Sequence, residues 1–260
     1  MSKILAITNQ KGGVGKTTTS VNLAASLAAA KQRVLLIDLD PQGNATMGSG
    51  INKADLEMTI YDVLLGEKSV AEARITSEAG KYDILPANRE LAGAEIELVD
   101  VEGREMRLKE ELQEVLPEYD YILVYCPPAL NLLTLNGLCA ARSVMIPMQC
   151  EYYALEGLSD LVNTIRKVRE NLNPELEIEG LLRTMFDPRN ALAQQVSDQL
   201  QQHFGDKVYR TVIPRNVRLA EAPSFGIPAL YHDSQSKGTL AYLALAGEML
   251  NNATAQVVAA

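Results

Sequence analysis

Short apolar runs alternate with longer helical patterns along this chain of 260 residues. The apolar runs show no regular polar alternation, which indicates strands covered on both faces, as in a parallel sheet. They occupy residues 4–8, 34–37, 82–86, 121–125, 143–148, 178–185 and 208–212; helical patterns occupy residues 17–30, 154–171, 190–204 and 237–251. This alternation predicts a doubly wound α/β fold, with helices flanking a mostly parallel sheet and ligands at the carboxyl ends of its strands.

The length and composition favour one globular domain over residues 1–250, followed by a tail, 251–260, that we expect to fray. Hydrophobic residues make up 47% of the chain and charged residues 22%, which excludes a disordered protein. Three cysteines without metal spacing fit a reducing cytosol. No apolar run is long enough for a membrane span or a signal peptide, so we expect a soluble, cytoplasmic protein.

The most informative segment is a glycine-rich loop that follows the first strand and opens the first helix. Glycines let the backbone turn tightly and point its N–H groups at phosphate oxygens. Lys16 is placed to reach the β- and γ-phosphates, and the Thr17 hydroxyl to ligate Mg²⁺. The usual P-loop pattern fails at its first glycine, where Gln10 stands, and a second lysine, Lys11, follows.

These motifs resemble a known family. Residues 11–17 are similar to the deviant Walker A box of the ParA/MinD group of P-loop ATPases, and residues 38–46 to its second box. Residues 126–128 and 214–224 narrow the resemblance to the ParA-type chromosome-partition ATPases, and it extends over about residues 2–250. It implies the P-loop NTPase fold, with ATP and Mg²⁺ as cofactors.

The resemblance also assigns residues to roles. Lys11 reaches across a homodimer to the partner's nucleotide, so that ATP favours the dimer and hydrolysis weakens it. Asp40 positions the attacking water, and Asp38 lies near the metal, unless its carboxylate instead caps the following turn. The implied ATP-binding residues are Lys11, Gly12, Gly13, Val14, Gly15, Lys16, Thr17 and Thr18, with Pro214 and Asn216 at the adenine; Lys11, Lys16 and Asp40 are catalytic, and Thr17 and Asp38 hold the metal.

One position departs from the family. Its members usually have an aspartate immediately before Cys-Pro-Pro, and that aspartate holds a water on Mg²⁺. This chain has Tyr125 there. A tyrosine is neutral at pH 7 and cannot supply the missing charge. We therefore expect weaker Mg²⁺ binding and slower hydrolysis than in the family, with ATP binding retained.

The net charge of −9 argues against a protein that is basic all over, but the charge is uneven. Residues 90–120 hold eleven acidic and three basic residues, whereas residues 183–218 hold six basic and three acidic ones. Arg189 and Arg218, with the adjacent Arg215, match the family's surface for non-specific double-stranded DNA. Such phosphate contacts are salt-sensitive, and an ATP dimer doubles them. Alternatively, these arginines pair with acids of their own chain: Asp187, Asp206 or Glu221.

The resemblance also implies a partner, a ParB-type centromere-binding protein that stimulates hydrolysis. It further implies that this chain associates with the nucleoid. Three alternatives remain open. A MinD-like membrane cycle needs a basic amphipathic C-terminal helix, but residues 239–260 contain no Lys or Arg. A metabolic P-loop enzyme or an iron–sulfur ATPase is the second alternative, although Cys126 and Cys139 are not obviously arranged for a cluster. The third is a partition ATPase that positions plasmids or other cargo.

Overall fold

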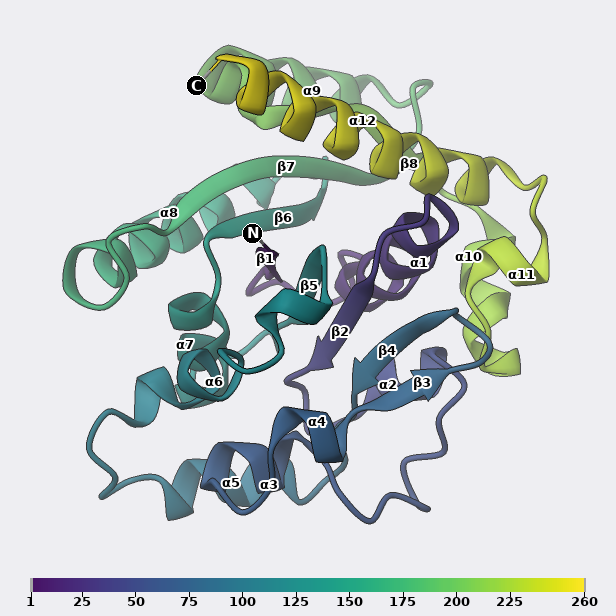
Figure 1. Ribbon diagram of the computed structural model, residues 1–260. Helices are drawn as coiled ribbons and strands as arrows, with labels where there is room; N and C mark the ends of the chain where they lie inside the picture. Colours follow the sequence, from purple (N-terminus) through teal and green to yellow (C-terminus); the bar gives the residue numbers. More distant parts are fainter. Residues whose placement is uncertain (1, 260) are drawn as a thin grey trace.

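The computed structural model describes the backbone of residues 2–259 and the side chains of residues 2–253. Within this range one eight-stranded sheet runs through the molecule in the order β3-β4-β2-β5-β1-β6-β7-β8 (Figure 1). Neighbouring strands are parallel except β3 and β4. The strands are β1 Lys3–Ile7, β2 Val34–Asp38, β3 Ile75–Ser77, β4 Tyr82–Leu85, β5 Tyr121–Tyr125, β6 Ser143–Gln149, β7 Glu177–Phe186 and β8 Val208–Pro214.

Helices cover both faces of the sheet. On each face, side chains of the helices and of the strands pack together in a buried apolar cluster. On one face lie α1 Lys16–Ala29, α2 Asn44–Gly48, α10 Val217–Glu221, α11 Ala229–His232 and α12 Lys237–Ala259. On the other lie α3 Ile60–Leu65, α4 Val70–Ala73, α5 Leu91–Glu97, α6 Arg107–Glu111, α7 Leu132–Ala140, α8 Ala154–Asn171 and α9 Ala191–Phe204. Short 3₁₀ turns occupy Arg104–Met106, Leu116–Glu118, Gly205–Lys207 and Ala222–Phe225.

Strand β5 shows how the sequence divides between the two faces. Ile122 and Val124 join the cluster under α5–α9, whereas Tyr121, Leu123 and Tyr125 join the cluster under α1 and α12. Successive side chains of a strand point to opposite faces, so an apolar run with no polar alternation is buried on both. Tyr125 thereby ends β5 on the face that carries α1.

The doubly wound fold and every strand expected from the sequence are confirmed. Strand β3 was not expected, because its three residues are too few to show a hydrophobic pattern. Its antiparallel pairing with β4 is what defines it as a strand. Helix α12 also runs to Ala259, beyond the predicted end near residue 251, because no glycine or proline stops it. Fraying of residues 251–260 stays a prediction. No helix within the described residues is long and apolar enough to cross a membrane.

Candidate nucleotide site

The glycine-rich loop lies at the carboxyl end of β1, between that strand and α1. Gly13 and Gly15 have φ of +74° and +86°, a left-handed conformation that a side chain would strain. Gly12 has no such φ, and a Cβ there would meet nothing within 4 Å. Nothing inside the chain therefore requires glycine at position 12. The loop is pinned to β7, where the Thr184 hydroxyl donates to the Val14 carbonyl over 2.8 Å.

The two lysines of the loop lie in contrasting environments. Lys16 is buried, and its Nζ donates to the carbonyl oxygen of Lys11 over 2.9 Å. Burial lowers the pKa of Lys16, and the charge of Asp40 opposes this shift. The Lys11 side chain is 42% exposed and forms an ion pair of 2.6 Å with Glu151, just beyond β6. Lys16 thus points into the loop, whereas Lys11 lies at its rim.

The two aspartates after β2 have separate tasks. Asp38 is fully buried, and its carboxylate accepts from the Asp40 N–H over 3.1 Å and from the N–H and hydroxyl of Thr46, each over 2.8 Å. Desolvation raises the pKa of Asp38 to about 7, although these hydrogen bonds oppose the rise. The structure therefore places Asp38 as a carboxylate that ties down the following turn. Within the part of the chain that the structure describes, its hydrogen bonds go to Asp40 and Thr46 and not to the phosphate loop.

Asp40 is the carboxylate that faces the loop. Its Oδ1 accepts from the Gln42 N–H over 2.9 Å, and its Oδ2 accepts from the Tyr125 hydroxyl over 3.0 Å. The Thr17 hydroxyl in turn donates to the Tyr125 hydroxyl over 3.1 Å. Desolvation is the main cause that raises the pKa of Tyr125 well above its ordinary value, so the phenol is neutral at pH 7.

The residue types present fit a magnesium ion held through the nucleotide. Mg²⁺ binds oxygen ligands and usually takes one or two protein groups besides substrate phosphates and water. Thr17 gives its only proton to Tyr125, which leaves its oxygen lone pairs free for a cation. Asp40 is the carboxylate linked to Thr17 through the Tyr125 hydroxyl, and position 125 adds no charge. Within the described residues no group of three or more His, Cys, Asp or Glu side chains could hold a metal without other ligands.

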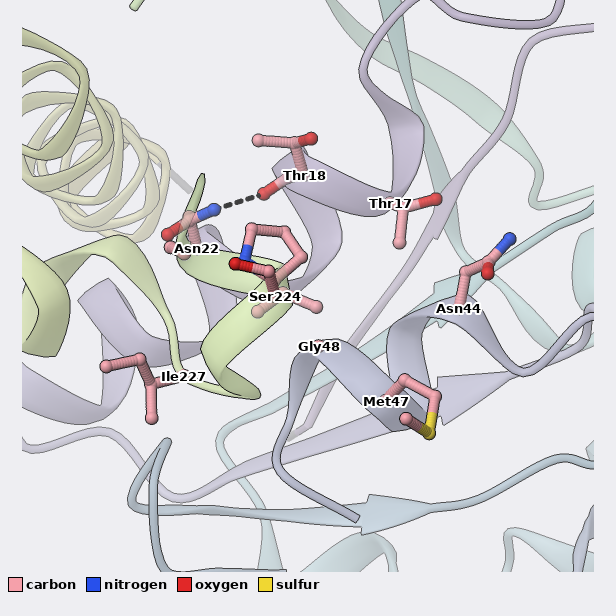
Figure 2. Close-up of a pocket in the computed structure, with 11 residues that line it drawn as sticks. Thr17, Thr18, Asn22, Asn44, Met47, Gly48, Ser224 and Ile227 are labelled. Carbon is pink, nitrogen blue, oxygen red and sulfur yellow. Dashed lines mark hydrogen bonds between the residues drawn. The ribbon is translucent and has the colours of Figure 1, made fainter. Parts of the chain in front are cut away.

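A groove of about 440 Å³ opens beside the start of α1 (Figure 2). Thr17 and Thr18 form its edge nearest the phosphate loop, and Val21, Met47 and Ile227 supply apolar walls. Asn22 donates to the Thr18 carbonyl over 2.8 Å, which fixes the α1 side of the groove. The site therefore continues past the loop into a cleft between α1, α2 and residues 222–227.

The residues expected at the adenine lie at the end of β8. Pro214 ends that strand, where it pairs with Phe186 of β7. The Asn216 side chain caps α10 by accepting from the N–H groups of Arg218 and Leu219. Contact of Pro214 or Asn216 with a base stays a prediction. The structure does place both beyond the β7 end against which the phosphate loop packs.

The three arginines expected to bind DNA are exposed. Arg189 forms a two-pronged pair with Asp187, at 3.0 Å and 2.8 Å. Arg218 pairs with Glu221 at 2.7 Å and with Asp233 at 3.3 Å. The own-chain pairing considered from the sequence is thus present for these two, although Asp206 is not used. Exposed ion pairs are weak and exchange readily with phosphate, so the pairing leaves DNA contact open.

Besides the bridge from Thr17 through Tyr125 to Asp40, sequence reasoning missed two contacts at this site. The Glu151–Lys11 pair joins residues 140 positions apart, and Thr46 holds Asp38 from within the second motif. Asp38 and Thr46 both lie in the second motif, but no periodic pattern reveals which side chain faces which. A glycine loop between a parallel strand and a helix, with one buried and one exposed lysine, defines this protein as a P-loop ATPase of the two-lysine type.

The chain is similar in sequence and in fold to known proteins. A family model described as an AAA domain matches residues 2–178. The chain is 57% identical to the sporulation initiation inhibitor protein Soj of Bacillus subtilis, over 97% of this chain and 100% of that protein. It is 51% identical to the chromosome partitioning protein ParA of Myxococcus xanthus, over 98% of this chain and 90% of that protein. The fold is also similar to a solved structure of cobyrinic acid a,c-diamide synthase from Mycobacterium smegmatis with bound ATP analog and magnesium. The two align with a TM-score of 0.86 and 36% identity, over 98% of this chain and 96% of that chain. The chain belongs to the ParA/Soj family of partition ATPases.

Proposed function

We propose that this protein is an ATPase that dimerises on ATP, binds DNA without sequence preference and drives the segregation of a chromosome or plasmid. The observation that carries the proposal is the loop with its two lysines: Lys16 is buried within it, and Lys11 stands free enough at its rim to meet a second subunit. Identity of 48–51%, over 90% or more of both chains, to relatives named for chromosome partitioning supports the cellular role. The protein would then work in the cytoplasm, on the nucleoid.

Nucleotide binding follows from the loop. Backbone N–H groups of residues 11–18 and the Lys16 ammonium hold the phosphates, and Thr17 and the phosphates hold Mg²⁺. An ion held there would supply positive charge that offsets the charge developing on the phosphates during hydrolysis. Asp40, ordered by Gln42 and Tyr125, accepts a hydrogen bond from the attacking water and orients it. Asp38, assigned to the metal by resemblance, acts instead by fixing the turn that carries Asp40.

Dimerisation follows from charge and from space. Two ATP molecules between two subunits bring many negative charges together, and a lysine from each partner offsets them. Lys11 must leave Glu151 to do this, and an exposed ion pair costs little to break. Open space at Gly12 allows the partner's backbone to approach closely.

The DNA surface is formed by Arg189, Arg215 and Arg218. Each monomer offers few phosphate contacts, and the dimer doubles them, so ATP controls binding and hydrolysis releases the DNA. A ParB-type partner on the centromere would stimulate that hydrolysis. Within the described residues Arg215 has no ion pair, and the other two arginines can exchange a carboxylate for a phosphate.

We infer further that hydrolysis is slow and that the missing charge at Tyr125 contributes to this by weakening the binding of Mg²⁺. Its neutral hydroxyl stands where the family has a charged group to hold a metal-bound water. The comparison is turnover of Tyr125→Asp and wild type across Mg²⁺ concentrations. The variant should be faster when Mg²⁺ is limiting. Equal rates there would contradict the inference.

The competing functions have less support. A MinD-like membrane cycle needs basic residues near the C-terminus, and the sequence from 239 onward has none. An iron–sulfur ATPase needs cysteines at a subunit surface, whereas Cys126, Cys139 and Cys150 are all buried. A metabolic role rests on solved structures of cobyrinic acid a,c-diamide synthase at 36% identity, below the 51–57% of relatives named for partitioning and sporulation. Positioning of plasmids or other cargo uses the same site and stays possible.

The test of DNA binding is the double variant Arg189→Ala with Arg218→Ala. It should lose retention on non-specific DNA with ATP present and keep the affinity of the wild type for ATP. The matched control is Arg166→Ala with Arg169→Ala, which removes two arginines from α8 and should leave retention unchanged. Retention by the first variant equal to that of the control would refute the assignment.

A further inference from the structure

Tyr125 links the two sides of the nucleotide site. It ends β5 on the face that carries α1, and its side chain is 3% exposed. Its hydroxyl lies between Thr17, the first threonine of α1, and Asp40, the carboxylate after β2. Three separate segments of the chain therefore meet at one phenolic oxygen.

The hydrogen bonds of this oxygen run in one direction. A carboxylate only accepts, so the Tyr125 proton goes to Asp40 over 3.0 Å. With that proton committed, the Tyr125 oxygen can only accept from Thr17, over 3.1 Å. Thr17 keeps its lone pairs and Asp40 keeps its charge. The arrangement therefore fixes both groups without consuming what each needs for its role.

We propose that Tyr125 is a positioning residue for hydrolysis, which holds the water-orienting carboxylate of Asp40 in register with the Thr17 hydroxyl. The inference rests on the proposed ATPase function and adds a role for this chain's own departure from its family. An aspartate at 125 is too short to bridge these two groups and leaves space for water. The longer phenol reaches both groups and places a fixed hydroxyl between them.

The neighbouring groups explain why a hydroxyl suits this place. A charged residue at 125 would add a third carboxylate beside Asp38 and Asp40, with Lys16 as the nearby cation. A phenol adds a donor and no charge. It also orders Asp40 on the side opposite the Gln42 N–H, so each carboxylate oxygen has one fixed partner.

The test is Tyr125→Phe, which removes the hydroxyl and keeps the ring. Its matched control is Tyr121→Phe, because Tyr121 lies four residues earlier on the same strand and the same face, at the end away from the site. In Tyr125→Phe, kcat should fall about tenfold or more, since a hydrogen bond to a charged group is lost. KM for ATP should change less than twofold. Tyr121→Phe should keep both values.

Two further readouts separate positioning from packing. Binding of a fluorescent ATP analogue, titrated with Mg²⁺, should give the same half-saturation for Tyr125→Phe and wild type. In an Asp40→Asn background, Tyr125→Phe should lower kcat less than twofold further, because Tyr125 acts through Asp40. Full additivity of the two changes, or wild-type kcat in Tyr125→Phe, would overturn the proposal. Wild-type turnover tests the ATPase itself, whereas the ratio of variant to wild type tests Tyr125.

Discussion

The buried carboxylate of Asp38 makes the stability of this protein depend on pH. Asp38→Asn keeps the size of the side chain and removes its titration. Burial raises the pKa of Asp38 from its ordinary value of 3.8 to about 7 in the fold. Between these values the unfolded chain loses the proton while the folded chain keeps it. The free energy of unfolding of the wild type should therefore fall, relative to the variant, as pH rises from about 4 to about 7.

The size of the effect follows from the shift. One pKa unit corresponds to about 1.4 kcal/mol, so three units give about 4 kcal/mol across the whole window. Between about pH 4.5 and 7.5, roughly 3 kcal/mol of this should appear. Asp38→Asn also weakens the hydrogen bonds from Thr46, but that loss is similar at every pH. The slope of the difference, and not its absolute value, reports the buried carboxylate.

Urea unfolding at four pH values, without nucleotide or Mg²⁺, measures this slope. Asp160→Asn is the control, because it removes an exposed carboxylate of α8 and should follow the wild type. The free energies of unfolding of Asp38→Asn and wild type are plotted against pH. If the two curves stay parallel, Asp38 is ionised in the fold and its proposed structural role is wrong. A charged Asp38 would then be available to a metal.

Three further predictions concern the loop and the core. Gly12→Val should leave the free energy of unfolding unchanged, since its Cβ meets nothing within 4 Å. It should abolish the ATP-dependent dimer in sedimentation. A stable dimer would refute the close approach of the two subunits at Gly12. Glu151→Gln frees Lys11 and should lower the ATP concentration that half-saturates dimerisation by up to about fivefold; a rise would show that Glu151 assists the dimer. Gly137→Ala places a Cβ 2.7 Å from Cys126 Sγ and should destabilise the fold by about 1–3 kcal/mol in urea unfolding; an unchanged midpoint would contradict the packing.

Much of the fold could be predicted because its strands are buried on both faces. A run such as Val34–Asp38 is apolar enough to be recognised alone, and the glycine loop marks where β1 ends. Strand β3 could not be predicted in this way. Its residues Ile75–Ser77 have mixed burial, and pairing with β4 places them in the sheet.

The candidate site was predicted less completely, because motif spacing fixes position and not side-chain partners. The structure places Lys16, whose pKa is lowered by burial, within range of the charge of Asp40, which opposes that shift. The roles expected of the loop residues and Asp40 stay predictions. Asp38 is buried against Thr46, a contact that depends on how the turn closes. Tyr125 was expected to remove a charge from the site, but nothing in the sequence showed that its hydroxyl would bridge Thr17 and Asp40. Such distances are set by the packing of α1 on β5.

The central claim is that ATP switches the binding of DNA. The most direct measurement is retention of the wild-type protein on non-specific double-stranded DNA with ATP, with ADP and without nucleotide, over a range of salt concentrations. Our account expects retention with ATP alone, declining steeply as salt rises because the contacts are to phosphates. Retention that is the same in all three nucleotide states would contradict the account.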